Sequence, residues 1–208
     1  MKNILSPQIT DKLEEMSSLF VVDDGIYCDG MCRLDLTSQR AKRVTFRRMV
    51  FKNAAFTQAS FNMSDVGDVF FEHCDLSNAV FDSTSIYRAE FSGCRITGID
   101  MSTSRLHNVV FVNCTGKYAN FRFSRFENVA FRNCGLQSAD FQSASFANTS
   151  FFETDLRQAQ MSGSALSGID FSSCNIDGFG ARPEDLRGAV ILPEQAVVAA
   201  KILGIIIK

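Results

Sequence analysis

The chain has 208 residues, of which 46% are hydrophobic, and a formal net charge of −2. This length and balance suit one domain built around a substantial core. Residues 1–15 show no apolar run behind a basic start, and no stretch reaches 18 consecutive apolar residues. These features argue against a secretory leader and a membrane span, so we expect a cytoplasmic protein without membrane contact.

Residues 1–20 form a lead that carries no repeat, and we interpret them as an N-terminal cap. Ser6-Pro7 resembles the start of a helix. A five-residue rhythm begins near residue 21, but Ala41 interrupts it. We expect residues 21–43 to form degenerate first coils, because terminal repeats must close a core to solvent. Within the lead, apolar residues are spaced for one or two helical turns: Leu13, Met16 and Leu19.

A strict repeat of five residues organises residues 44–176. Of the 27 positions counted at every fifth residue from Phe46 to Ile176, all but Gly116 hold a large apolar side chain. The residues two places earlier are small or medium-sized and uncharged, whereas every charged residue falls on the other three places. Two places of each five therefore face a core and three face water. Self-similarity at a fixed period is the signature of a solenoid.

A second period, of 20 residues, shows how often the chain turns. Phe occupies every 20th position from Phe51 to Phe171, whereas the column from Phe56 to Ile176 holds no Phe after Phe56. Four pentapeptides per coil, one on each side of a square, would stack like side chains in this way. Another column places cysteines 20 residues apart, or a multiple of 20: Cys74, Cys94, Cys114, Cys134 and Cys174.

The triplets Ala119-Asn120-Phe121 and Ala139-Asp140-Phe141 resemble the consensus of the pentapeptide repeat family, in which Ala and Asp or Asn precede a central Leu or Phe. The resemblance extends over about 135 of the 208 residues. It implies an all-β solenoid, a right-handed quadrilateral β-helix with four pentapeptides per coil, which we place at residues 21–192. Members of the family differ in function, so the resemblance predicts the fold more directly than the activity.

We interpret the cysteine column as reduced thiols in the core, because parallel Cβ vectors on neighbouring rungs suit a disulfide poorly. The alternatives are disulfides within the column and a metal ladder, but the column has no inward His or carboxylate and no CxxC spacing. His73 and His107 belong to different columns and have no nucleophile or ligand at motif spacing. We therefore predict a non-enzyme without catalytic residues, cofactor or metal.

A basic segment, residues 33–52, contains a single acid, Asp35. One interpretation is a collar that contacts nucleic acid or an acidic partner. We favour a solvated coil surface, because no aromatic ladder or nucleic-acid-binding motif accompanies the charges. We accordingly expect no direct contact with nucleic acid. The bases of the segment are Arg33, Arg40, Lys42, Arg43, Arg47, Arg48 and Lys52.

Residues 193–208 form a different module. Pro193 and Glu194 are typical of the first turn of a helix, and Gly204 is typical of its end. This helix is apolar around most of its circumference and must therefore be buried on more than one side. The residues after it predict a short strand. We expect a homodimer joined through this module, with an interface formed by Leu203, Ile205, Ile206 and Ile207.

The long rod, the short lead and the C-terminal helix are similar to the Qnr-type members of the family, which protect DNA gyrase from quinolones. That resemblance implies a dimer that mimics DNA and binds DNA gyrase or topoisomerase IV. Two features differ from Qnr-type proteins. The register leaves no room for inserted loops, and residues 60–178 carry 13 acids and 8 bases, a net of −5. Duplex DNA of the same length, ~29 Å, carries about 17 charges.

Two groups of residues are candidates for a partner-binding surface. Asp82, Asp100 and Asp140 flank one column of central residues and should lie on one side of the square. Tyr118 and Phe123 are outward aromatic residues near the broken core position. The alternative to a DNA mimic is a rigid scaffold for another protein. A strongly acidic face favours the mimic, whereas a mixed surface with an aromatic patch favours the scaffold.

Overall fold

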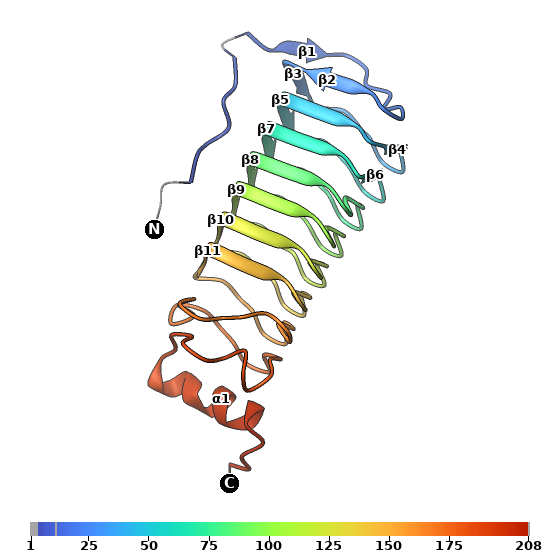
Figure 1. Cartoon of the computed structure of the whole chain (residues 1–208). Helices are drawn as coiled ribbons and strands as arrows, with labels where there is room; N and C mark the ends of the chain where they lie inside the picture. Colours follow the sequence, from blue (N-terminus) through green and yellow to red (C-terminus); the bar gives the residue numbers. More distant parts are fainter. Residues whose placement is uncertain (1–3, 11, 208) are drawn as a thin grey trace.

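The computed structural model describes residues 4–10 and 12–207, which form a right-handed quadrilateral parallel β-helix with a short C-terminal helix (Figure 1). The expected fold class is confirmed. No helix within the described residues is long and apolar enough to cross a membrane. The elements are β1 (Glu14–Met16), β2 (Ile26–Cys28), β3 (Gly30–Cys32), β4 (Arg40–Lys42), β5 (Thr45–Lys52), β6 (Ser60–Asn62), β7 (Asp65–Glu72), β8 (Ser85–Ser92), β9 (Arg105–Val112), β10 (Arg125–Arg132), β11 (Ser145–Phe152), the 3₁₀ turn η1 (Pro193–Gln195) and α1 (Ala196–Ile202).

Rungs 20 residues apart stack into one main sheet along the rod. Strands β5, β7, β8, β9, β10 and β11 pair in parallel in that order, and Phe71 lies beside Phe91 in the register. On the other sides of the square, single bridges such as Ala55↔Asp75 and Val80↔Asp100 repeat at the same interval. The 20-residue period of the sequence is therefore the pitch of one coil.

The all-Phe column forms a continuous stack of rings in the core. Ring centroids are 4.6 Å apart between Phe71 and Phe91, 4.7 Å between Phe91 and Phe111, and 4.8 Å between Phe111 and Phe131. These spacings match the separation of neighbouring strands, ~4.8 Å. The backbone hydrogen bonds and the ring stacking therefore favour the same geometry, and all four rings are almost completely buried.

Corners with a left-handed backbone give the repeat its period of five. Positive φ angles recur at every fifth residue over most of the rod, as at Asn53 (52°), Gln58 (58°) and Met63 (56°). A left-handed residue turns the chain sharply, so each pentapeptide supplies one side and one corner. Ser, Asn, Asp and Gly are common at these places, because short polar side chains and glycine tolerate this conformation best.

The cysteine column has a structural role that it shares with a column of hydroxyls. The Cys94 thiol donates to the Phe71 carbonyl at 3.2 Å, and the Ser104 hydroxyl donates to the Phe81 carbonyl at 2.9 Å, in both cases 23 residues back. Thr154 replaces a cysteine in its column and bonds the Phe131 carbonyl in the same manner. All seven cysteines are free thiols, and the described residues contain no cluster suited to a metal ion.

The N-terminal segment is extended, so the predicted helix is wrong. Strand β1 pairs in parallel with β3, which would otherwise present an open edge at the end of the solenoid. That edge offers backbone partners to an extended chain, and this outweighs a weak helical pattern. Residues 4–10 then run along the side of the rod (Figure 1), where the Gln8 amide donates to Asp68 Oδ1 at 2.9 Å and the Leu5 amide to Asn108 Oδ1 at 3.3 Å.

The C-terminal helix begins at Pro193, as the sequence predicts, and its last residue is Ile202. The short strand predicted at Ile205–Ile207 is absent from the structure. Gly204 has a φ of 79°, and the Ile205 amide donates to the Ala200 carbonyl at 2.9 Å, so the backbone here caps the helix instead of pairing as a strand. The three isoleucines are consequently exposed to solvent.

Asp185 forms hydrogen bonds that stabilise the coil around it. Because its carboxyl titrates at low pH, the stability of the fold should depend on pH in the acid range. The Asp185 carboxylate accepts hydrogen bonds from the Arg182 guanidinium at 2.8 Å, from the Gly163 backbone amide at 2.8 Å and from the Arg182 backbone amide at 3.0 Å. These contacts, chiefly the one from the guanidinium, lower its pKa from 3.8 to about 2. A carboxyl with a lowered folded-state pKa stabilises the fold above its unfolded pKa, and this stabilisation is lost as the pH falls towards about 2. The side chain is almost fully buried.

We expect Asp185→Asn to lower the free energy of unfolding by about 2 kcal/mol at pH 7, corresponding to the shift of the pKa. Urea unfolding of both proteins from pH 7 to pH 2 measures this difference. The difference should shrink as the pH falls below 4, because the carboxyl of the parent becomes protonated. A difference that stays constant down to pH 2 would contradict this explanation.

Candidate protein-binding surfaces

The structure places the three candidate acids on one side of the square. Asp100 and Asp140 belong to a single ladder of bridges, with Asn120 between them. Asp82 lies two residues after Val80, which pairs with Asp100 in the same ladder. All three carboxylates are half-buried at the corners. The arrangement expected from the column of central residues is therefore present.

Local hydrogen bonds occupy much of this acidic face. Asp100 Oδ1 accepts from the Ser102 amide at 2.9 Å and from the Asn120 side chain at 3.0 Å. Asp140 Oδ1 accepts from the Gln142 amide at 2.9 Å, and its Oδ2 lies 3.4 Å from Arg122 Nη1. These carboxylates support the turns that carry them, and one of them is partly neutralised. The face is acidic, but it is not a dense row of free charges.

Tyr118 and Phe123 lie at successive corners of one coil and are both exposed, at 58% and 54%. Each ring contacts the cation that precedes it: Lys117 Nζ lies 4.7 Å from the Tyr118 centroid, and Arg122 Cζ lies 5.4 Å from the Phe123 centroid. A cation above an aromatic ring stabilises both groups modestly. The two corners thus present aromatic and positive groups together, next to the acidic face.

Gly116 does not leave a hole in the core. A Cβ atom at this position would lie 2.8 Å from Ile96 Cγ1 and 2.8 Å from Leu136 Cδ2. The side chains of the rungs above and below therefore fill the space that a central residue normally occupies. The broken position is a close-packed variation of the core, and it opens no pocket toward Tyr118.

The basic segment of residues 33–52 is largely paired with acids. Lys52 Nζ lies 2.8 Å from a Glu72 carboxylate oxygen, and Arg43 Nε lies 2.6 Å from Asp24 Oδ1. Exposed pairs of this kind add little stability, but they cancel the charge of the collar. This pairing agrees with the interpretation of a solvated coil surface. Among the described residues, the pairs are Arg33–Glu15, Arg43–Asp24, Arg47–Asp65, Arg48–Asp29 and Lys52–Glu72.

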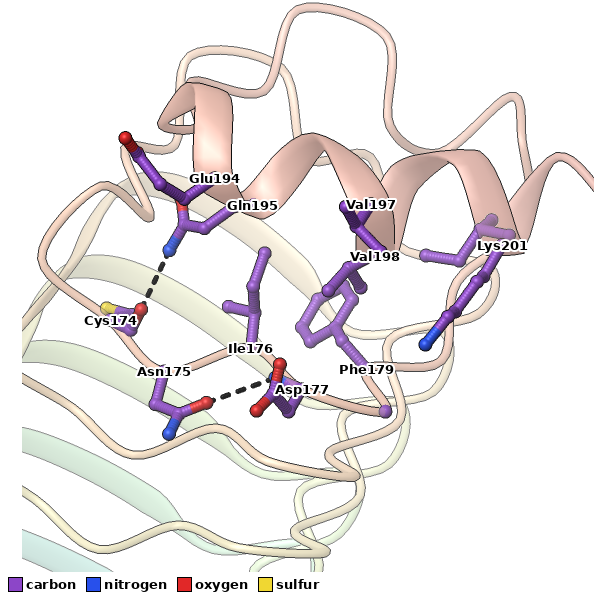
Figure 2. A pocket seen from close by; sticks show the side chains of 12 residues that line it. Cys174, Asn175, Ile176, Asp177, Phe179, Glu194, Gln195, Val197, Val198 and Lys201 are labelled. Carbon is purple, nitrogen blue, oxygen red and sulfur yellow. Dashed lines mark hydrogen bonds between the residues drawn. The ribbon is translucent and has the colours of Figure 1, made fainter. Parts of the chain in front are cut away.

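The C-terminal helix lies across the end of the rod and leaves a groove of about 820 Å³ beside the last coil (Figure 2). Val198 is buried against the coil, and Gln195 donates from Nε2 to the Cys174 carbonyl at 2.8 Å and to the Phe171 carbonyl at 3.0 Å. Burial raises the pKa of the Cys174 thiol, which lines this groove. The helix is therefore firmly attached on one side. Beyond its last residue, Ile202, the candidate interface residues are exposed: Leu203 at 59%, Ile205 at 53%, Ile206 at 85% and Ile207 at 48%.

A cleft that the sequence analysis missed lies beside β11. Its volume is about 370 Å³, and its walls are β11 and the segment from Ser167 to Ser173. The sequence does indicate this cleft, because the residue type changes in two series of positions spaced 20 residues apart. Gly168 replaces the Asn at 108, 128 and 148, and Asp170 replaces the small or apolar residues Ala130 and Ser150. Both replacements lie in the rung at which the ladder of backbone hydrogen bonds from β11 stops.

Comparisons with known proteins agree with this architecture. Two family models match, "Pentapeptide repeat region" over residues 64–141 and "Pentapeptide repeats (8 copies)" over residues 134–172. Together they span more than half of the chain. No curated protein sequence matches significantly.

Among solved structures, the chain is similar to a trypsin-treated variant of QnrB1, a plasmid-mediated fluoroquinolone resistance protein. The identity is 17%, the TM-score is 0.58, and the match covers 90% of this chain and 100% of the other. It is also similar to HetL, a protein involved in heterocyst differentiation regulation in the cyanobacterium Nostoc, with 12% identity, a TM-score of 0.42, and coverage of 81% and 90%. The stacked rungs, the five-residue corners and the matching family models lead to one conclusion: the chain belongs to the pentapeptide repeat proteins.

Proposed function

We propose that this protein is a non-enzymatic rod that binds a type II topoisomerase, DNA gyrase or topoisomerase IV, in place of DNA. The observation that supports this most is an acidic side of the rod, formed by residues 80–83, 100–103, 120–123 and 140–143. On this side the acids are Asp82, Asp100 and Asp140, and the base is Arg122. A rigid surface that displays negative charge complements a site built for a phosphate backbone. The fold that the chain shares with QnrB1 is consistent with this proposal.

We also propose that two copies join end to end through their C-terminal modules. Leu203 and Ile205–Ile207 form an apolar end that a monomer leaves in water. Contiguous apolar surface of this kind usually marks a protein interface. A twofold dimer would bury the same patch on both copies and would double the length of the rod.

The second candidate function is a general protein-binding scaffold. Two observations favour it over the mimic: the ion pairs that cancel charge along the rod, among them Arg88–Asp68 and Arg95–Asp75, and the exposed corner residues Tyr118 and Phe123. A partner with an apolar and partly acidic surface would fit these two corners. The topoisomerase experiment separates the two functions.

Replacing Asp82, Asp100 and Asp140 together by Asn should weaken the action on gyrase at least tenfold and leave the fold intact. Asn keeps the size of Asp and most of the corner hydrogen bonds, but it removes three charges from one face. Supercoiling by gyrase, with and without a quinolone, measures the effect as the protein is titrated. The parent protein should also lose potency as the salt concentration rises, because screening weakens such contacts.

The matched control is the triple Asn variant of Asp75, Asp155 and Asp177, which occupy equivalent backbone positions on the neighbouring side of the square. It should act like the parent protein. Equal potency of the Asp82 triple variant and the parent would exclude this face as the contact. A parent protein without any effect on gyrase would favour the scaffold.

A further inference from the structure

The sheet along the rod is interrupted once, at the far edge of β11. Seven residue pairs join β10 to β11, from Arg125↔Ser145 to Arg132↔Phe152. Among the described residues, no backbone hydrogen bond joins residues 145–153 to the following rung at 165–173. The Glu153 amide bonds a side chain instead, the Ser173 hydroxyl at 3.1 Å. Strands β5, β7, β8, β9 and β10 of the main sheet are paired on both edges. The free edge is therefore confined to the boundary between β11 and the rung at 165–173, which we call the seam.

Two kinds of corner meet at the seam, which explains the interruption. In β7 to β11 the chain passes the corner in an extended form, with a left-handed residue such as Asn128 (φ 54°) or Asn148 (φ 52°) inside the strand. In the next rung, Gly168 (φ 78°) belongs to a tight turn closed by the Ile169 amide and the Leu166 carbonyl at 3.1 Å. The two corner types have different backbone paths, so the rungs separate there.

The cleft that results has the chemistry of a strand-binding site. Phe146 and Phe152 supply apolar surface, Phe152 with 52% exposure, and the opposite wall is formed by residues 167–173, in which the Ile169 side chain is buried in the core. The Thr149 hydroxyl oxygen is buried in this region and has no hydrogen-bond partner among the described residues. A buried polar atom without a partner is costly unless a ligand or water satisfies it.

We propose that this cleft binds an extended peptide segment of a partner protein, which adds a strand to the free edge of β11. The unpaired N–H and C=O groups of the edge match the backbone of another strand, which alternates donors and acceptors. Small or β-branched side chains of the segment would contact the exposed ring of Phe152, and a polar group of the segment would reach Thr149. Open edges of this kind are otherwise protected in native proteins, because they pair with any available strand.

The test uses the full chain and a labelled hexapeptide of alternating valine and threonine, blocked at both ends. The control peptide has the same sequence with alternate amides N-methylated, which removes backbone donors but retains the side chains. We expect the first peptide to slow hydrogen exchange of the amides in residues 145–153 at least tenfold, and the second to have no effect. Absence of protection at millimolar peptide would overturn the proposal.

Two variants locate the site. Phe152→Asp should weaken peptide binding, measured by fluorescence anisotropy, at least tenfold, whereas Met63→Asp, at an exposed corner elsewhere, should not change it. The double variant Gly168→Asn, Asp170→Ala copies Asn128 and Ala130 and should close the seam, abolishing binding in a folded protein. If the amides of residues 145–153 are protected without peptide and this protection rises with protein concentration, the occupant is a second copy and the proposal is wrong.

Discussion

Replacing Phe111 by Asp is expected to prevent the rod from folding. Phe111 is completely buried and stacks on Phe91 at 4.7 Å and on Phe131 at 4.8 Å, in the middle of the column. Loss of a buried Phe costs about 3–5 kcal/mol, and burial of a carboxylate without a partner adds several more. The sum approaches the whole stability of a typical domain, about 5–15 kcal/mol.

The solenoid architecture makes this substitution more damaging than its position alone suggests. Each rung is stabilised by its two neighbours, so a break in the middle uncouples the rungs on either side. Circular dichroism and solubility measure the outcome, which should be aggregated protein or protein without a cooperative unfolding transition. Phe123→Asp is the control, because Phe123 is exposed at a corner with φ of 60°, where Asp is well tolerated. A soluble and cooperatively folded Phe111→Asp protein would contradict the inward register.

Deletion of residues 193–208 should convert the expected dimer into a monomer or an aggregate. The deletion removes the exposed apolar end, and it also uncovers Phe171, Ile176 and Phe179 in the last coil. It further removes the two hydrogen bonds that Gln195 makes to the carbonyls of that coil. Light scattering of the intact protein should give twice the chain mass of 23.1 kDa.

A double substitution separates the effect on dimerisation from the effect of uncovering the last coil. Leu203→Ser combined with Ile206→Ser leaves Val198 and Gln195 on the last coil but makes the exposed end polar. This variant should be a folded monomer, with a melting temperature that no longer depends on protein concentration. An intact protein that scatters as a 23.1 kDa monomer at micromolar concentration would exclude the dimer.

The inferred binding modes act at different places on the molecule. The acids of the topoisomerase proposal lie on the side of the ladder from Val80 to Asp140, whereas the cleft lies at β11. The variants of Asp82 and of Phe152 should therefore affect their own partners independently. Sites that are well separated and share no contacts usually act additively.

The sequence by itself determined the architecture of each coil, namely which residues point inward and how many repeats complete one turn. The five-residue repeat marks the inward residues, and the 20-residue recurrence of Phe and Cys shows that four repeats complete one turn. The start of the C-terminal helix at Pro193 could likewise be predicted from the sequence. These features depend on local conformational rules and on neighbours at a constant separation along the chain, so a single sequence contains all the information needed.

Only the tertiary structure decided the features that depend on non-periodic contacts. Glu14–Met16 became a strand because β3 offered an open edge, whereas Ile205–Ile207 formed none, and the Ile205 amide instead bonds the Ala200 carbonyl at the end of the helix. Arg122 reduces the charge of Asp140 from an adjacent rung, 18 residues away. The cleft at β11 arises where two corner geometries meet, and its shape depends on how whole rungs stack. Such outcomes reflect competition between alternative partners in space, which the order of residues does not express.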